Sequence, residues 1–121
     1  MIGELHHVEL RVNSLEPLSW LLAELGYDTY QEWPEGVSWK LGHTYIVLEL
    51  AEGSHDRRLP GLSHLAFDAG SRADVDALTA DALQNGFTLL YTDRHPFAGG
   101  QDHYAAFLET NERFKVELVA R

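Results

Sequence analysis

Two histidines and two glutamates are the residues of this chain whose types and places best suit chemistry. His7 and Glu49 stand in the first half of the 121 residues, and His64 and Glu117 stand in the second half. Imidazole nitrogens and carboxylate oxygens are ligands for divalent Ni, Co, Mn, Fe and Zn. The chain has no cysteine, so only nitrogen and oxygen atoms are available to hold an ion. These four residues are therefore candidate ligands of one divalent metal.

Each of the four candidates is expected on a strand, because apolar and polar residues alternate around it with a period of two. In the last strand, for example, Val116 and Leu118 point one way and Glu117 points the other. All four candidates fall on the polar face of their strand, so they converge if two sheets curve around one cavity. Any one of them alone is explained equally well as a solvated side chain on an open sheet face.

The elements that must position these residues occur twice along the chain. Residues 5–12 and 62–69 are similar apolar runs with a histidine in third place, which indicates an internal repeat. A helix is expected after each run, over residues 15–25 and 73–84. Ser71 and Asp74 form a capping-box pattern before the second helix.

Three more strands are expected in each half of the chain. They are residues 27–31, 37–41 and 44–50 in the first half, and residues 88–91, 103–108 and 114–119 in the second. Residues 51–60 are the predicted linker, and residues 93–101 are a loop rich in proline and glycine. We therefore expect one domain over residues 1–121, with a first module over about 1–52 and a second over about 60–121.

Five segments carry a resemblance to a known family. They are Leu5 to Val12, Leu25-Gly26-Tyr27, Val47-Leu48-Glu49-Leu50, Pro60 to Phe67 and Phe114 to Val119. These segments resemble the vicinal-oxygen-chelate superfamily, which holds glyoxalase I, ring-cleaving dioxygenases and fosfomycin or bleomycin resistance proteins. The resemblance covers essentially the whole chain. It implies an α+β fold of two βαβββ modules that form a curved mixed-sheet cleft, and it implies a homodimer.

The resemblance also implies roles for single residues. His7, Glu49, His64 and Glu117 fall on the metal-ligand positions of glyoxalase-like members. Phe107 stands ten residues before Glu117, where ring-cleaving and fosfomycin-modifying relatives have a tyrosine, so extradiol cleavage that uses this residue is disfavoured. The family's Asp-Pro-Asp-Gly turn is replaced by residues 110–113, Thr-Asn-Glu-Arg, so this turn must form without its glycine.

The leading functional hypothesis is a metal-dependent lyase, isomerase, transferase or dioxygenase. The ion would chelate two oxygens of a small oxygen-rich substrate and stabilise an enolate or oxyanion as a Lewis acid. Glu49 or Glu117 would act as the general base, and the sequence does not rank them. The alternative is a metal-free drug-binding protein of the bleomycin-resistance kind.

Four further residues on the polar strand faces are candidates for substrate binding. They are Arg11, Tyr45, His103 and Phe107. A surface ion pair between Arg11 and Glu9 explains the arginine equally well. His103 has the alternative of being a surface imidazole.

Composition excludes several classes of partner. The formal net charge is −10, and nine Lys and Arg residues are spread along the chain, so no basic face is expected for nucleic acid. No apolar stretch approaches the roughly 20 residues that span a membrane, and the N-terminus has no export signal. We expect a cytoplasmic protein whose partner is a small molecule.

Overall fold

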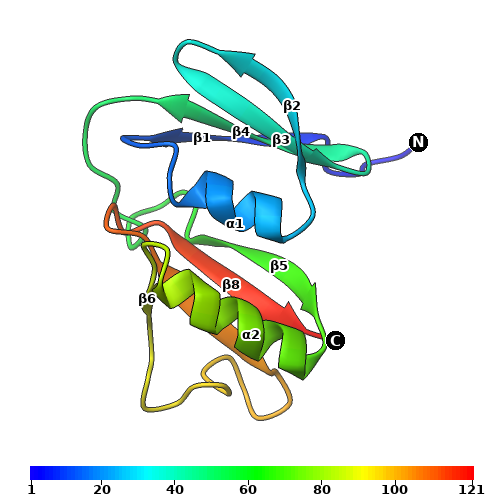
Figure 1. The fold of residues 1–121 in the computed structure, drawn as a ribbon, viewed down its shortest axis with the longest axis vertical. Coiled ribbons are helices and arrows are strands. Elements are labelled where there is room, and N and C mark those ends of the chain that lie inside the picture. The colour runs from blue at the N-terminus through cyan, green and yellow to red at the C-terminus, as the bar shows by residue number, and fades with distance from the viewer. The chain divides into compact units, whose positions relative to one another are not determined.

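The computed structural model describes all residues from 1 to 121, and the chain divides into two compact units, Met1–Gly53 and Ser54–Arg121. Each unit contains one four-stranded mixed sheet and one helix, in the order strand, helix, strand, strand, strand (Figure 1). The predicted α+β fold of two βαβββ modules is confirmed. The unit boundary places residues 54–60, the second part of the predicted linker, with the second unit.

The first unit has its β1 and β4 strands side by side at one end of the sheet. Its elements are β1 (His7–Val12), α1 (Leu18–Glu24), β2 (Asp28–Trp33), β3 (Gly36–Leu41) and β4 (Thr44–Leu50). The strand order is β1-β4-β3-β2, with β1 and β4 parallel and the other pairs antiparallel. Leu10 and Leu48 from the sheet and Leu21 from the helix are among the buried side chains of this unit.

The second unit has the same strand order. Its elements are β5 (His64–Gly70), α2 (Arg72–Leu83), β6 (Thr88–Leu89), β7 (Ala105–Glu109) and β8 (Lys115–Ala120). The strand order is β5-β8-β7-β6, with β5 and β8 parallel. Val75 and Ala82 of the helix and Val116 and Leu118 of β8 are almost completely buried. The alternation predicted for β8 thus gives the sheet one apolar face, which leaves the other face for polar residues.

The two helices begin for different reasons. The Ser71 hydroxyl accepts a hydrogen bond from the Asp74 N–H, and the Asp74 carboxylate accepts one from the Ser71 N–H, so the predicted capping box is confirmed. The bond from the Ser71 N–H to the Asp74 carboxylate is the main reason why the pKa of Asp74 lies below its usual range. The first helix begins at Leu18, three residues later than predicted, directly after Pro17. Proline has no N–H to donate, which suits it to a helix start and not to an interior.

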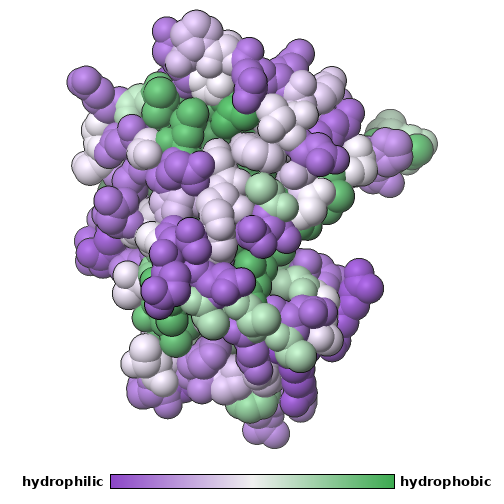
Figure 2. Space-filling model, viewed as in Figure 1, coloured by the Kyte–Doolittle hydropathy of each residue, from purple (hydrophilic) through white to green (hydrophobic).

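Hydrophilic residues cover most of the face of the molecule seen in Figure 2, as a formal net charge of −10 leads us to expect. Neither helix is long and apolar enough to cross a membrane.

Candidate functional site

Glu117 on β8 is the centre of a cluster of polar side chains in the second unit. Its side chain is buried, with an exposed fraction of only 7%. Its Oε1 accepts a hydrogen bond from His64 Nε2 at 3.0 Å, and its Oε2 accepts one from His103 Nε2. The parallel pairing of β5 and β8 puts His64 opposite Lys115 and Ala66 opposite Glu117, so His64 reaches Glu117 diagonally across the same face.

His103 comes from the segment just before β7, and the sequence predicted it as a substrate-binding residue. A Cβ atom added to Gly99 would lie 2.6 Å from His103 Cδ2 and 3.4 Å from Phe107 Cζ. The missing side chain of Gly99 therefore leaves the space that the His103 ring occupies. This gives Gly99 a packing role beside the cluster, where the sequence suggested only a loop.

The donor set of the cluster suits a divalent ion by its chemistry. Two imidazole nitrogens face the two oxygens of one carboxylate, and first-row divalent metals accept both ligand types. No group of three or more His, Asp or Glu side chains already has the arrangement of a metal site. The nitrogens are instead hydrogen-bonded to the carboxylate, so the three side chains must turn from one another toward an ion in order to bind it.

The first unit does not bring its two candidate ligands together. His7 is exposed, lies with its Nδ1 2.9 Å from His6 Nδ1, and stacks on the Tyr45 ring at 4.7 Å between centroids. Glu49 accepts a hydrogen bond from Trp33 Nε1 at 2.7 Å.

The strand register explains this separation. In the first unit His7 lies opposite Tyr45, and Glu49 lies four residues beyond Tyr45. Four residues of a strand span roughly 13 Å. In the second unit the corresponding offset is two residues, from Lys115 to Glu117. Relative to the residue opposite each histidine, Glu49 therefore lies two residues further along β4 than Glu117 lies along β8, so the two glutamates do not occupy corresponding places.

The remaining predicted substrate-binding residues have separate surroundings. Arg11 and Glu9 are both exposed and approach to 3.7 Å, which matches the alternative of a surface ion pair. Tyr45 contacts the rings of His6 and His7. Phe107 is buried and meets the His64 ring edge-on at 6.0 Å between centroids, so it lies beside the cluster.

Two residues near the cluster received no role from the sequence. Lys115 donates a hydrogen bond from Nζ to the Tyr91 hydroxyl at 2.9 Å. This bond from a cation favours the phenolate and lowers the pKa of Tyr91. Strand alternation already placed Lys115 on the same face as Glu117, which is the signal that could have identified it. Tyr91 stands at the end of the strand predicted over residues 88–91, but β6 ends at Leu89, so the predicted alternation does not extend to Tyr91.

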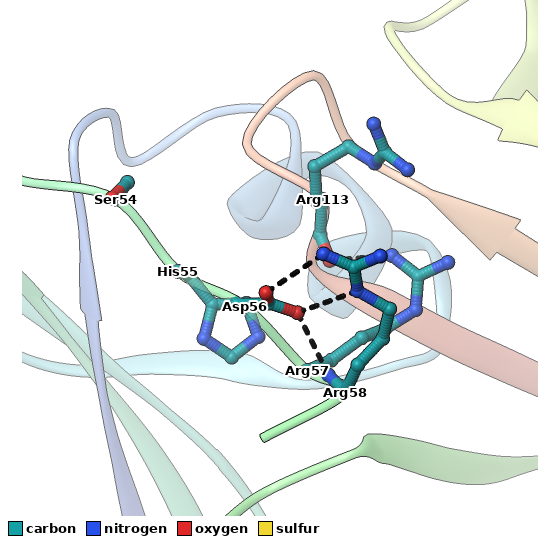
Figure 3. Close-up of a pocket in the computed structure, with 6 residues that line it drawn as sticks. All are labelled: Ser54, His55, Asp56, Arg57, Arg58 and Arg113. Atoms are coloured by element: carbon teal, nitrogen blue, oxygen red, sulfur yellow. Dashed lines mark hydrogen bonds and ion pairs between the residues drawn. The ribbon is translucent and has the colours of Figure 1, made fainter.

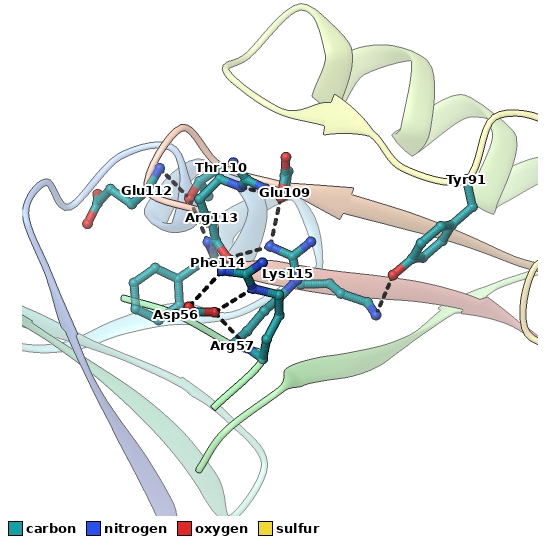
Figure 4. A network of polar contacts seen from close by, with 10 residues as sticks. Asp56, Arg57, Tyr91, Glu109, Thr110, Glu112, Arg113, Phe114 and Lys115 are labelled. Carbon is teal, nitrogen blue, oxygen red and sulfur yellow. Dashed lines mark hydrogen bonds and ion pairs between the residues drawn. The ribbon is translucent and has the colours of Figure 1, made fainter. Parts of the chain in front are cut away.

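The second part of the predicted linker packs on the turn between β7 and β8. Ser54, His55, Asp56, Arg57, Arg58 and Arg113 line a pocket of about 400 Å³ (Figure 3). Arg57 Nη1 donates to Glu109 Oε2 at 2.8 Å and to the Arg113 carbonyl at 3.0 Å (Figure 4). The segment is thus attached to the second unit by a polar network.

The same network explains how the turn forms without glycine. Arg113 has a φ of 69°, in the left-handed region that glycine normally occupies. The Thr110 hydroxyl accepts hydrogen bonds from the Glu112 and Phe114 N–H groups, and the Arg113 N–H donates to the Thr110 carbonyl. These hydrogen bonds offset the conformational strain at Arg113.

We expect Arg57→Ala to lower the free energy of unfolding by about 2 kcal/mol, because a largely buried carboxylate and a carbonyl each lose a donor. The Arg57 and Glu109 side chains are each only 15% exposed. Arg58 is the matched control, since its side chain is 85% exposed and pairs with Asp56 at the surface. Arg58→Ala should leave stability unchanged within error. Urea denaturation measures the free energy of unfolding of both variants. Equal effects of the two substitutions would refute the stabilising role of Arg57.

Comparison with known proteins gives one family and a curated relative that is similar over nearly its whole length. The sequence profile of the Glyoxalase/Bleomycin resistance protein/Dioxygenase superfamily matches residues 6–107. The uncharacterized protein YqjT of Bacillus subtilis (strain 168) is 47% identical over 125 residues, which cover 96% of this chain and 98% of YqjT.

Solved structures agree with this result. A candidate glyoxalase from Bacillus halodurans has a TM-score of 0.92 and 49% identity, and the match covers 98% of this chain and 96% of that one. The fosfomycin resistance protein FosX from Mesorhizobium loti has a TM-score of 0.74 at 18% identity, over 100% of this chain and 94% of FosX. At that identity FosX shows the fold alone.

Proposed function

The chain belongs to the Glyoxalase/Bleomycin resistance protein/Dioxygenase superfamily, and on this premise we propose that it is a metal-dependent enzyme that acts on a small oxygen-rich molecule. The observation that carries the proposal is the contact of Glu117 with both His64 and His103. The proposed feature is the binding of substrate oxygens by a divalent ion, which the lyases, isomerases, transferases and dioxygenases of the family share. Ni, Co, Mn, Fe and Zn all suit the donor set.

His64, His103 and Glu117 are the residues of the second unit that would hold the ion. When bound, the ion supplies Lewis-acid stabilisation of negative charge on substrate oxygens. Glu117 can also accept a proton from the substrate, since a carboxylate that moves off an imidazole becomes a free base. Phe107 is buried and meets the His64 ring edge-on, so an apolar ring lies beside this imidazole.

His7 and Glu49 of the first unit remain proposed ligands, with Glu49 as the alternative base. The bond from Trp33 Nε1 fixes one oxygen of Glu49 and leaves the other oxygen available. His7 and Glu49 lie apart along their strands. The contribution of each to metal binding is therefore measured with its own single substitution.

The test is metal analysis of the protein after incubation with each of the five ions and removal of unbound metal. We expect one ion per chain in the wild type. The double variant His64→Ala, His103→Ala should lose it, whereas His43→Ala, at an exposed histidine, should keep it. His7→Ala and Glu49→Gln then report on the first unit.

Two outcomes would count against the proposal. One is stoichiometric metal in the double variant, which would place the ion elsewhere. The other is no binding of any of the five ions by the wild type, which would favour the metal-free drug-binding protein instead.

A further inference from the structure

Lys115 is a cation without a carboxylate partner, in a chain rich in acidic residues. Six of the seven arginines form an ion pair with an Asp or Glu side chain: Arg11, Arg57, Arg58, Arg94, Arg113 and Arg121. Lys115 Nζ makes one hydrogen bond, to the Tyr91 hydroxyl, and lies 5.1 Å from the centroids of the Tyr91 and Phe107 rings. An ammonium has three donors, so two are left for another group.

This ammonium shares a face of the sheet with the Glu117 cluster. Lys115 lies directly opposite His64 in the β5 and β8 pairing, and neighbouring strands are about 4.8 Å apart. The centroid of the Phe107 ring lies 6.0 Å from that of the His64 ring and 5.1 Å from Lys115 Nζ, so both residues neighbour the same ring. A small molecule bound at His64 and Glu117 is therefore within reach of Lys115.

The surroundings of Lys115 favour binding of an anion. Aromatic rings replace part of the water around the ammonium, which strengthens its interaction with a negative group. The Tyr91 hydroxyl accepts from Lys115 and so fixes the direction of the ammonium (Figure 4). Tyr91 itself has a φ of 55°, an unusual backbone conformation that residues at functional sites often adopt.

We propose that Lys115, held by Tyr91, binds the carboxylate or phosphoryl group of a substrate whose chelating oxygens face His64 and Glu117. This inference rests on the proposed function and adds the class of substrate, a small chelating molecule with an anionic group. The net charge of −10 repels such a molecule at long range, and Lys115 provides the local attraction that offsets this repulsion.

The first experiment compares two chelators that differ by one carboxylate. Protein loaded with Co²⁺ is titrated by calorimetry with acetohydroxamate and with succinic acid monohydroxamate. We expect the carboxylate-bearing compound to bind about tenfold more tightly. Lys115→Met should remove this preference, and Lys115→Arg should retain part of it.

Lys40 provides the matched control. It is the only other lysine, it also lies over a tyrosine ring, that of Tyr30 at 4.5 Å, and it also has no carboxylate partner. Lys40→Met should keep the tenfold preference. Equal affinity for the two chelators in the wild type, or a preference that survives Lys115→Met, would overturn the proposal.

A second experiment uses the wild-type chain without metal, so it does not depend on whether a variant folds. Because the chain has only two lysines, ¹³C-lysine labelling gives two sets of side-chain NMR signals. Addition of succinate or inorganic phosphate at constant pH should shift the Lys115 signals and leave those of Lys40 in place. Equal shifts of both lysines, or no shift of Lys115, would overturn the anion site. Failure of all five ions to bind, together with a selective Lys115 shift, would instead refute the proposed function and leave the anion site standing.

Discussion

Glu117→Gln is expected to lower the affinity for Co²⁺ or Ni²⁺ at least about a hundredfold, the largest loss of any single substitution in the cluster. The amide has nearly the same shape as the carboxylate but carries no charge and presents only one oxygen. Glu117 is the group to which both His64 and His103 are hydrogen-bonded, so the change affects every member of the cluster. Calorimetric titration of metal-free protein measures the affinity.

Glu24→Gln is the control for this substitution, because it makes the same chemical change at an exposed position at the end of α1. It should leave the metal affinity unchanged. Circular dichroism of both variants checks that the fold is intact. An affinity for Glu117→Gln within a fewfold of the wild type would mean that Glu117 is a structural partner of the two histidines and not a ligand.

Strand alternation predicted the fold and part of the cluster well. The bounds of β4 agree with the prediction at both ends, and Glu117 was assigned correctly to the face of β8 opposite Val116 and Leu118. Alternation has a period of two, so it reports the face of each residue without any knowledge of the partner strand. For the same reason, alternation places His64 and Glu117 each on the polar face of its strand.

Register is the part that alternation cannot supply. Which residue of β5 lies opposite Glu117 depends on how two strands far apart in the sequence pair, and the β5 and β8 pairing joins residues about fifty positions apart. The offset of four residues between Tyr45, opposite His7, and Glu49 is likewise invisible in the local pattern. Alternation therefore does not rank the four candidates, whereas the structure shows that His64 and Glu117 meet within the second unit and that His7 and Glu49 lie apart within the first.

Loop residues were missed for a different reason. Arg57 lies in the predicted linker, and Tyr91 lies beyond the end of β6 although the predicted strand included it. Both reach their partners through long side chains. No periodicity constrains where such side chains point. His103 was identified only because the predicted strand extended to it, although β7 begins two residues later, at Ala105.

Metal binding is also expected to raise the thermal stability of the protein strongly. An ion that binds only the folded chain stabilises it by about 2.7 kcal/mol when its free concentration is a hundred times the Kd. For a chain of 121 residues this corresponds to a rise in Tm of roughly 10 °C. Differential scanning calorimetry of metal-free protein with and without Co²⁺ measures the shift, and excess chelator should reverse it.

The same Co²⁺ concentration should raise the Tm of Glu117→Gln by only about 1–2 °C, since a hundredfold weaker Kd leaves the site half occupied. Mg²⁺ at that concentration serves as the ion control, because it prefers oxygen ligands and keeps its water, and it should have little effect on the wild type. A solvated surface cluster would give no shift with Co²⁺. Equal shifts for the wild type and Glu117→Gln would show that Co²⁺ stabilises the fold from another site, and the Glu117 cluster would then lose its assignment as the metal centre.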